Sequence, residues 1–429
     1  MRKTTSVKNK IFTYLAILLG LILAFIGGYF SRYIIDSRNA NVVSDVVKLI
    51  DKVGYVYDQT TGEERKLTEK EIVGAITNSV LDDYAKYYTQ EELVDLANQR
   101  AGNNTGIGLS FIDEDLIVDK VIGGSPAKSA GVISGDRLVS GKLENQAQVQ
   151  FSSYDDLTNF MSNVMVNQTI SLTIERGGQE KIFNITKKNY IASYVHYKDS
   201  QVEMTYDNVD DYLVLKSVET SASFLGDDKA IITLDAFNGD CVGQFRSMLE
   251  RMKERGRTKL ILDLRNNGGG DMDLLLGISS MLIKNEGKAN TLVAVAKGKQ
   301  GSNPEYFYTT KNDYYSHISA ISVVANERTA SASECLIGAL IHYGDNFNMN
   351  RLVIEKNQDG VAKTFGKGIM QTTYYLATGG ALKLTTAKIY WPDSQTCIHS
   401  TGIIATGENA TTAKNALARA VEVVDLPLS

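Results

Sequence analysis

Three short passages in the second half of the chain carry residues that could together perform nucleophilic chemistry. Ser331 stands where a predicted strand, residues 321–325, gives way to an apolar helix. A helix N-terminus presents backbone N–H groups and a favourable dipole, so a serine there could attack a carbonyl while the developing oxyanion is stabilised. Lys367 lies between two glycines, beside apolar residues, in the passage TFGKGIMQ. Burial disfavours an ammonium and lowers the pKa of a lysine, which would make Lys367 a usable general base.

Each of these passages also has a purely structural interpretation. The SASE tetrapeptide that starts at Ser331 fits a capping box, in which a serine only satisfies backbone donors of the helix. Lys367 could be a solvated loop lysine. The third passage, LDLRNNGGG at residues 262–270, could be a flexible turn after a strand, and it is not a P-loop because no GK[ST] follows. Asp263 and Arg265 are best interpreted as a structural ion pair at the end of that strand.

The elements that must position these residues form an alternating pattern. Strand-like apolar runs occur at residues 231–234, 260–262, 292–295 and 321–324, and helical stretches separate them. Strands that alternate with helices predict an α/β domain with a mainly parallel sheet. We expect this catalytic core to cover residues 205–429.

Residues 104–188 read instead as short strands and turns. Isoleucine and leucine alternate with polar residues over 170–174, and the glycine pair at 177–178 predicts a hairpin turn. Earlier in the segment, GIGLSF at residues 106–111 is a glycine-containing turn that enters an apolar strand. The stretch GGSPAKSAG follows, and GDRL comes after it. The segment therefore predicts a small β-rich domain.

The N-terminal region contains an apolar stretch without charge, residues 11–30. A helix of that length spans roughly 30 Å, the thickness of a hydrocarbon core. Four basic residues and no acidic ones precede it: Arg2, Lys3, Lys8 and Lys10. The positive-inside rule then predicts a single-pass membrane anchor with residues 1–10 in the cytoplasm and the rest outside. The alternative is a cleaved signal peptide, but its apolar region would be about 7–15 residues long and would end in small residues.

Residues 39–103 predict a small helical arm between the anchor and the β-rich domain. Two capping boxes support helices here, Thr68 with Glu71 and Thr89 with Glu92. Nothing in this segment indicates chemistry.

Composition excludes several classes of function. The 429 residues carry 45 Lys+Arg against 50 Asp+Glu, a net charge of −5, whereas nucleic-acid binders usually show a basic excess. The 3 cysteines are far apart and form no CxxC pair, and the 4 histidines are scattered without an HExxH motif. We therefore expect no disulfide framework and no structural zinc site. The interpretation of the whole chain given below implies no metal and no organic cofactor.

The GIGL turn and the GGSPAKSAG…GDRL stretch closely resemble a PDZ domain of the bacterial, protease-associated kind. In such domains the turn presents backbone N–H groups to the terminal carboxylate of a peptide, which adds as an extra strand to the sheet. Glycines suit that role because no Cβ hinders the approach of the carboxylate. The resemblance assigns the carboxylate loop to four residues: Gly106, Ile107, Gly108 and Leu109. The alternative is a tight turn in an unrelated β domain.

LDLRNNGGG, TASASE and TFGKGIMQ, in that order, resemble the carboxyl-terminal processing (tail-specific) proteases of peptidase family S41. The resemblance covers nearly everything after residue 40. It implies a multidomain α/β chain in which the PDZ domain precedes a crotonase- and ClpP-like ββα protease core. The family uses a Ser/Lys dyad, in which the lysine amine takes the serine proton. Carried over, the nucleophile is Ser331, the base is Lys367, and the glutamine that steadies the lysine is Gln371.

The same resemblance assigns an oxyanion hole. One donor is the backbone N–H of Ala332, directly after the nucleophile. The other comes from the glycine turn, where many family members have proline at the position of Gly268, and proline has no N–H. Gly269 is then the preferred donor and Gly270 the alternative. The chain departs from the family pattern at residues 328–329, where Arg-Thr replaces the usual Gly-Ser and could alter access to the nucleophile.

The resemblance implies a membrane-anchored serine endopeptidase outside the cytoplasmic membrane. It would cleave polypeptides with free C-termini after the PDZ domain engages the tail. Nucleic acid is not expected as a partner, and a homo-oligomer is compatible with the resemblance. Two alternatives stay open: an inactive scaffold that binds peptide tails, and a crotonase-like acyl-transfer enzyme, which leaves the PDZ domain unexplained. Ser331, Lys367 and Gln371 are all present and favour the protease, since a scaffold needs no base beside a serine.

Overall fold

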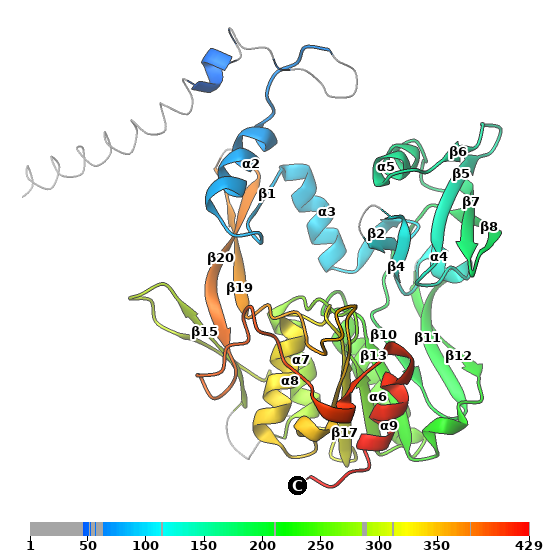
Figure 1. Ribbon diagram of the computed structural model, residues 1–429, viewed down its shortest axis with the longest axis vertical. Helices are drawn as coiled ribbons and strands as arrows, with labels where there is room; N and C mark the ends of the chain where they lie inside the picture. The colour runs from blue at the N-terminus through cyan, green and yellow to red at the C-terminus, as the bar shows by residue number, and fades with distance from the viewer. Residues whose placement is uncertain are drawn as a thin grey trace, which may run out of the picture. The chain divides into compact units, whose positions relative to one another are not determined.

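The computed structural model describes residues 46–50, 52, 56, 63–112, 115–209, 212–284, 290–310, 313–377 and 379–428 (Figure 1). The chain divides into two compact units, residues 1–83 and residues 84–429. The predicted anchor at residues 11–30 lies outside the described residues. Among the described helices, none combines the length and the apolar character that crossing a membrane requires.

The first unit contains helix α2 (Glu69–Val80). The Thr68 hydroxyl accepts the backbone N–H of Glu71, and the Glu71 carboxylate accepts the N–H of Thr68 at 2.8 Å. This confirms the first predicted capping box. Arg65 pairs with the same carboxylate at 2.6 Å.

The second unit begins with β1 (Lys86–Tyr88) and α3 (Gln90–Arg100). The capping box of Thr89 and Glu92 at the start of α3 is also confirmed. The prediction that residues 39–103 are helical is wrong at β1, which pairs antiparallel with β20 (Ala381–Tyr390). Tyr87 and Tyr88 are buried there, and aromatic side chains favour a pleated, half-buried surface.

Residues 103–191 form a β-rich module. Its six-stranded sheet has the order β3-β4-β5-β7-β8, with β6 on β5, and β2 pairs separately with β9. The β7–β8 hairpin confirms the predicted turn at residues 177–178. The bounds are β2 (Asn103–Gly106), β3 (Leu109–Ile112), β4 (Ile117–Val121), α4 (Pro126–Ser129), β5 (Arg137–Leu143), β6 (Val149–Gln150), α5 (Tyr154–Ser162), β7 (Thr169–Arg176), β8 (Gln179–Thr186) and β9 (Lys188–Ile191).

The core is an eight-stranded sheet in the order β12-β11-β10-β13-β14-β17-β18-β21. From β13 to β21 all neighbours are parallel, as predicted, whereas β10, β11 and β12 add an antiparallel meander. The sheet already begins at Val195, ahead of the predicted core start at residue 205. The bounds are β10 (Val195–Lys198), β11 (Val202–Val209), β12 (Tyr212–Glu219), β13 (Lys229–Leu234), β14 (Lys259–Asp263), β17 (Ala320–Ala325), β18 (Leu352–Glu355) and β21 (Ala410–Thr411).

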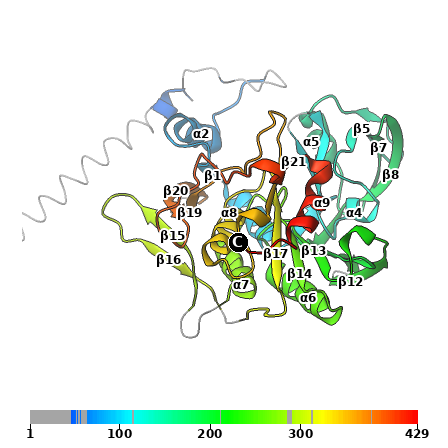
Figure 2. The same ribbon diagram turned by 60° about the horizontal axis from the view of Figure 1, so that its bottom comes forward.

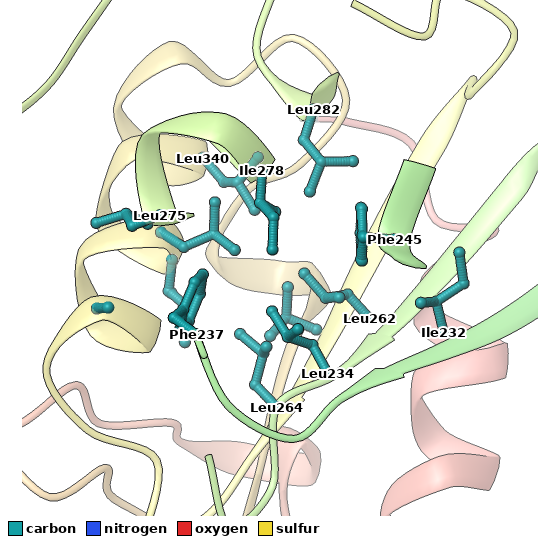
Figure 3. Packing of buried hydrophobic residues seen from close by; sticks show 14 of the residues in the cluster. Ile232, Leu234, Phe237, Phe245, Leu262, Leu264, Leu275, Ile278, Leu282 and Leu340 are labelled. Atoms are coloured by element: carbon teal, nitrogen blue, oxygen red, sulfur yellow. The ribbon is translucent and has the colours of Figure 1, made fainter. Parts of the chain in front are cut away.

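Helices cover both faces of the parallel strands, which explains why these strands are continuous apolar runs (Figure 2). Ile232, Leu262 and Val323 face a large cluster with side chains of α6, α7 and α8 (Figure 3), while Ile231, Ile261 and Val324 face α9. The helices are α6 (Cys241–Glu254), α7 (Met272–Leu282), α8 (Ala332–Tyr343) and α9 (Ala413–Val423), and the short 3₁₀ turns are η2 (Ser223–Leu225), η3 (Met349–Arg351) and η4 (Gly407–Asn409).

A second, antiparallel sheet lies apart from the parallel one. Its order is β1-β20-β15-β16, and β19 (Ile369–Tyr375) also pairs with β20. The run at residues 292–295, predicted as part of the parallel sheet, lies here as β15 (Leu292–Gly298), beside β16 (Glu305–Tyr308). That prediction is wrong because an apolar run indicates a buried strand but does not specify its partner.

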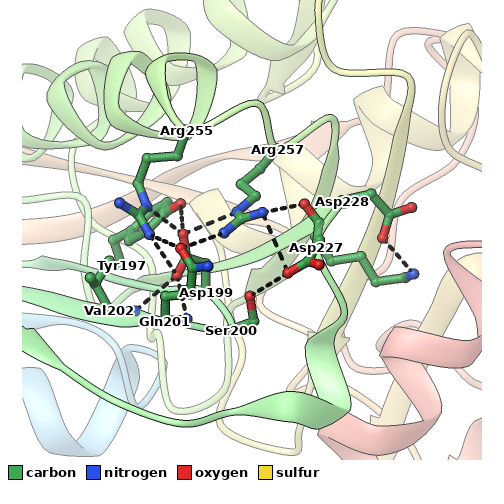
Figure 4. Close-up of polar contacts among 10 residues, drawn as sticks. Tyr197, Asp199, Ser200, Gln201, Val202, Asp227, Asp228, Arg255 and Arg257 are labelled. Carbon is green, nitrogen blue, oxygen red and sulfur yellow. Dashed lines mark hydrogen bonds and ion pairs between the residues drawn. The ribbon is translucent and has the colours of Figure 1, made fainter.

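A polar network surrounds Asp199, in the turn between β10 and β11 (Figure 4). The carboxylate is fully buried and accepts hydrogen bonds from Arg255, Arg257 and the Tyr197 hydroxyl. Burial alone opposes ionisation of Asp199. The bonds from Arg255, two backbone N–H groups and Arg257 outweigh it and hold the pKa of Asp199 well below its usual range.

We expect Asp199→Asn to destabilise the chain by about 3–5 kcal/mol at pH 7, because it removes the buried carboxylate that pairs with both Arg255 and Arg257. Since the folded pKa lies below the unfolded value of about 4, this contribution is complete above about pH 5 and is lost as the pH falls further. Denaturant unfolding at pH 7 and pH 4 measures both effects. The control Glu254→Gln, in an exposed pair with Arg251, should change little. A pH-independent loss in Asp199→Asn would contradict this account.

Candidate active site

The predicted nucleophile and the glycine turn meet at one edge of the core sheet. β14 and β17 are parallel neighbours, so their carboxyl ends lie side by side. The glycine turn, residues 266–270, follows β14 and leads into α7, while residues 326–331 follow β17 and lead into α8. The pair Asp263 and Arg265 at the end of β14 is confirmed as an ion pair, at 2.6 Å.

Two asparagines of the glycine turn bond it to the serine turn, residues 326–331. The Asn267 carbonyl accepts the N–H of Ala330 and the Ser333 hydroxyl, both at 3.0 Å. The Asn326 side-chain amide donates to Asn266 Oδ1 at 2.7 Å. The two turns therefore form one rigid assembly, in which a shift of either displaces the other.

Ser331 occupies a strained backbone conformation, with φ 57° and ψ −114°. A non-glycine residue adopts such a positive φ only where the surroundings enforce it, at a cost on the order of 1–3 kcal/mol. An ordinary N-cap residue has an extended backbone instead, as Thr68 and Thr89 have. Ser331 does donate its N–H to Glu334, as a capping box requires. Capping alone does not explain the strain, which is typical of functional turns.

The glycine turn packs directly against Ser331. A Cβ on Gly269 would lie 2.8 Å from the Cβ of Ser331 and 2.9 Å from the N of Ala332, so only glycine fits. The Gly269 N–H donates to the side-chain oxygen of Asn267 at 2.9 Å. Among the described residues no acceptor is recorded for the N–H groups of Ala332 and Gly270. In this conformation the N–H of the preferred Gly269 is occupied, whereas those of Gly268 and of Gly270, the alternative donor, have no such acceptor among the described residues.

Glu334 connects the serine turn to the lysine loop, the segment around Lys367. Its fully buried carboxylate accepts the N–H groups of Ser331 and Lys367, both at 2.9 Å, the N–H of Gly366 at 2.8 Å, and the Thr364 hydroxyl. Burial raises the pKa of Glu334, and these four hydrogen bonds oppose the rise. Because every partner is a donor, the group acts as a carboxylate.

Lys367 is held by glycines that leave no room for side chains. A Cβ on Gly366 would lie 2.7 Å from the N of Gly402, and one on Gly368 would lie 2.7 Å from the N of His399. The segment 398–402 therefore crosses directly over the lysine loop. Lys367 itself is only half-buried, so the burial expected from its apolar neighbours is partial.

Tyr84 contacts both of the residues expected to provide the base. The Lys367 Nζ lies over the Tyr84 ring, 5.0 Å from its centroid. The Gln371 side-chain amide donates to the Tyr84 carbonyl oxygen. Gln371 thus reaches the lysine through Tyr84.

A cavity of about 480 Å³ unites most of the predicted site. Ser331, Ala332, Gly269, Lys367 and Gln371 all line it. Sequence reasoning missed other lining residues, among them Arg100, Asn238, Met272, Met370, Lys383 and Ile389.

Residues 39–103, where the sequence itself indicated no chemistry, contribute two residues to the surroundings of this site. Arg100 lines the cavity and Tyr84 contacts Lys367. No local signal marks either residue, because the pairing of β1 with β20 bridges almost 300 residues of sequence. In the part of the chain that the structure describes, no cluster of three or more His, Cys, Asp or Glu could hold a metal ion.

Residues 228–408 match the family model of peptidase family S41. These residues are hereafter called the S41 segment. The S41 segment contains Ser331, Lys367, Gln371 and the glycine turn, whereas Tyr84, Arg100 and the β-rich module lie outside it.

Relatives extend the similarity over most of the chain. A "Probable CtpA-like serine protease" of Staphylococcus aureus (strain COL) is 26% identical over 372 residues, 86% of this chain and 64% of that protein. The protein of the same description from Staphylococcus epidermidis is 27% identical over 414 residues, 94% of this chain and 74% of its own length. The chain thus spans somewhat less than two thirds of the length of the first of these relatives.

The fold is that of a solved processing protease. The photosystem II D1 C-terminal processing protease superposes with a TM-score of 0.50 at 19% identity, covering 90% of this chain and 97% of that one. At this identity the similarity concerns the fold alone.

The predicted carboxylate loop lies in the β-rich module, outside the S41 segment. The Ile107 carbonyl accepts the N–H of Ala127, and the Gly108 carbonyl accepts that of Ile122. Within the described residues no acceptor is recorded for the N–H groups of Ile107 and Gly108. The strand that follows, β3, is the terminal strand of its sheet. Donors and an open sheet edge therefore lie together.

The unusual Arg328 connects the S41 segment to this module. Its guanidinium forms an ion pair with Asp119 of β4. The next residue of β4, Lys120, donates to the carbonyl of Asp235 at 2.6 Å. Arg328 thus fixes the serine turn to the module.

If the Ser331 backbone is strained, Ser331→Gly should be more stable than Ser331→Ala by about 1 kcal/mol, because only glycine adopts this positive φ without penalty. Thermal unfolding of the two variants side by side measures the difference. Neither variant has the hydroxyl, so loss of its contacts cancels. Equal melting temperatures, or a more stable alanine variant, would show that the turn is not strained.

Proposed function

We propose that this chain is a serine endopeptidase of the carboxyl-terminal processing kind, with Ser331 as nucleophile and Lys367 as general base. The observation that carries the proposal is the strained backbone of Ser331 at the start of α8, in a cavity that Lys367 and the glycine turn also line. The match of residues 228–408 to the model of peptidase family S41 and the similarity to CtpA-like relatives support the same reaction class.

The proposed reaction needs one proton to move twice. Lys367 as a neutral amine accepts the proton of the Ser331 hydroxyl while the oxygen attacks the peptide carbonyl. The resulting oxyanion is stabilised by the N–H of Ala332, aided by the dipole of α8, and by an N–H of the glycine turn. Lys367 then returns the proton to the leaving amine, and water releases the acyl group from Ser331 by the same route.

Other chain residues keep this arrangement in place. Glu334 binds the backbone of both Ser331 and Lys367, so it fixes the distance between the two turns. Gln371 bonds to the Tyr84 carbonyl and so holds the residue whose ring lies over Lys367. These are positioning residues, because none of them touches the scissile bond in this scheme.

We expect Lys367→Arg to lower kcat/KM at least about a hundredfold, since arginine stays charged and cannot accept the serine proton. Cleavage of an unstructured peptide by the intact chain measures the loss. Ser331→Ala should be equally inactive, and both variants should keep a nearly unchanged melting temperature. Activity of Lys367→Arg within tenfold of the parent would remove Lys367 from the mechanism. An inactive parent chain would favour the scaffold interpretation.

We further propose that residues 104–188 act as a PDZ domain that recognises substrate tails. The supporting features are the N–H groups of Ile107 and Gly108 and the open edge of β3, at which a peptide could add as a strand. Glycines at 106 and 108 both have positive φ, and a Cβ on Gly108 would collide with Ser125.

If this loop holds a terminal carboxylate, amidation of the substrate C-terminus should reduce kcat/KM about tenfold or more, the scale of a charge-assisted hydrogen bond. The measurement compares free and amidated forms of one peptide. A small ester without a tail provides the control, because its hydrolysis should not depend on the loop. Equal cleavage of both peptides would reject the carboxylate-reading role.

The proposed location is the outer face of the cytoplasmic membrane, with residues 11–30 as the anchor. The support is the charge-free apolar stretch itself and the basic residues before it. Partners would be polypeptides with free C-termini.

A further inference from the structure

The feature that the mechanism leaves unexplained is Tyr84, which lies outside the S41 segment and yet contacts two of its functional residues. The Lys367 Nζ lies 5.0 Å from the centroid of the Tyr84 ring. The Gln371 side chain donates to the Tyr84 carbonyl oxygen. One residue therefore contacts the proposed base through its ring and the supporting glutamine through its backbone.

The fold holds the backbone at Tyr84 in place. β1 begins two residues later and pairs with residues 381–383 of β20. The same β20 pairs with β19, where Gln371 lies opposite Thr385. Tyr84 and Gln371 are therefore anchored to one strand, and the ring has a defined place above Lys367.

The contact distinguishes between the two protonation states of the lysine. The face of an aromatic ring attracts an ammonium through its quadrupole but gains little from a neutral amine. A general base must be neutral when it takes the serine proton. The Tyr84 ring thus favours the form of Lys367 that cannot start the reaction.

We propose that the Tyr84 ring binds the ammonium form of Lys367 in the resting enzyme and so sets the pH at which Lys367 begins to act as a base. Tyr84 is then a positioning residue for catalysis. This inference rests on the proposed role of Lys367.

Other charged and titratable groups also face Lys367 or its loop. Glu334 of α8 accepts the lysine backbone N–H, and His399 lies beside the Tyr84 ring at a centroid distance of 6.5 Å. Cys397 contacts the Gly368 carbonyl. The cavity adds Arg100, Asp271, Asp273, Cys335 and Lys383. All of these stay in place when only the Tyr84 side chain is changed, so a difference between variants at that position reports on the ring.

The test compares Tyr84→Phe, which keeps a ring, with Tyr84→Leu and Tyr84→Met, which do not. The backbone bond from Gln371 is available in all three. The readout is the pH profile of kcat/KM for an unstructured peptide, measured on the intact chain. In the ring-free variants we expect the ascending limb to move to lower pH by roughly 0.5–1 unit, because the ammonium has lost the attraction of the ring. Tyr84→Phe should keep the parent midpoint.

A purely structural role for Tyr84 would lower kcat/KM at every pH without moving the midpoint, and that result would overturn the inference. So would an equal shift in Tyr84→Phe and Tyr84→Leu. Two ring-free variants are used, Tyr84→Leu and Tyr84→Met. If one of them misfolds, the pH profile of the other still tests the inference.

A second measurement separates this inference from the proposed function. Lysine-selective NMR follows the titration of Lys367, with the signal identified by its loss in Lys367→Arg. A midpoint that falls in Tyr84→Leu but not in Tyr84→Phe supports the contact. An unchanged midpoint rejects it. If the NMR midpoint moves while the pH profile of kcat/KM does not, the contact stands and Lys367 is not the base.

Discussion

The candidate site depends on one buried carboxylate. Glu334 lies in the first turn of α8, where it accepts the backbone N–H of Ser331 on one side and those of Gly366 and Lys367 on the other. The two chain segments have no covalent connection near this point, so the carboxylate fixes their separation. A buried anion is tolerated only when its hydrogen-bonding capacity is filled, and four donors fill it here. The hydrogen bonds that satisfy this buried carboxylate thus set the relative placement of Ser331 and Lys367.

The parallel sheet supplies the rest of the framework. Its neighbouring strands β14 and β17 end together, and asparagine side chains tie the turns that follow them. Because helices pack on both faces, the strands cannot shift, and the strained conformation of Ser331 is maintained by its surroundings. The stability of the core therefore offsets the strain of the reactive turn.

Residues outside the S41 segment complete the site. Tyr84 meets Lys367, Arg100 lines the cavity, and Asp119 of the β-rich module pairs with Arg328 beside the nucleophile turn. The candidate nucleophile and base lie in short motifs, while segments distant in sequence surround them. The surroundings of Ser331 and Lys367 are therefore set partly by residues that the motifs do not contain.

The sequence by itself determined what local periodicity and short motifs encode. The capping boxes at Thr68 and Thr89, the hairpin at residues 177–178 and the alternation of strands and helices in the core all follow from spacing within a few residues. The candidate site residues Ser331, Lys367 and the glycine turn were also named from short passages, and all of them line one cavity. Tertiary structure alone decided that residues 292–298 join an antiparallel sheet, that residues 86–88 form a strand on β20, and that Tyr84 lies over Lys367. It also decided that Asn267 takes the Gly269 N–H. A strand carries the same apolar pattern whichever partner it pairs with, so such contacts are fixed only when the whole core is packed.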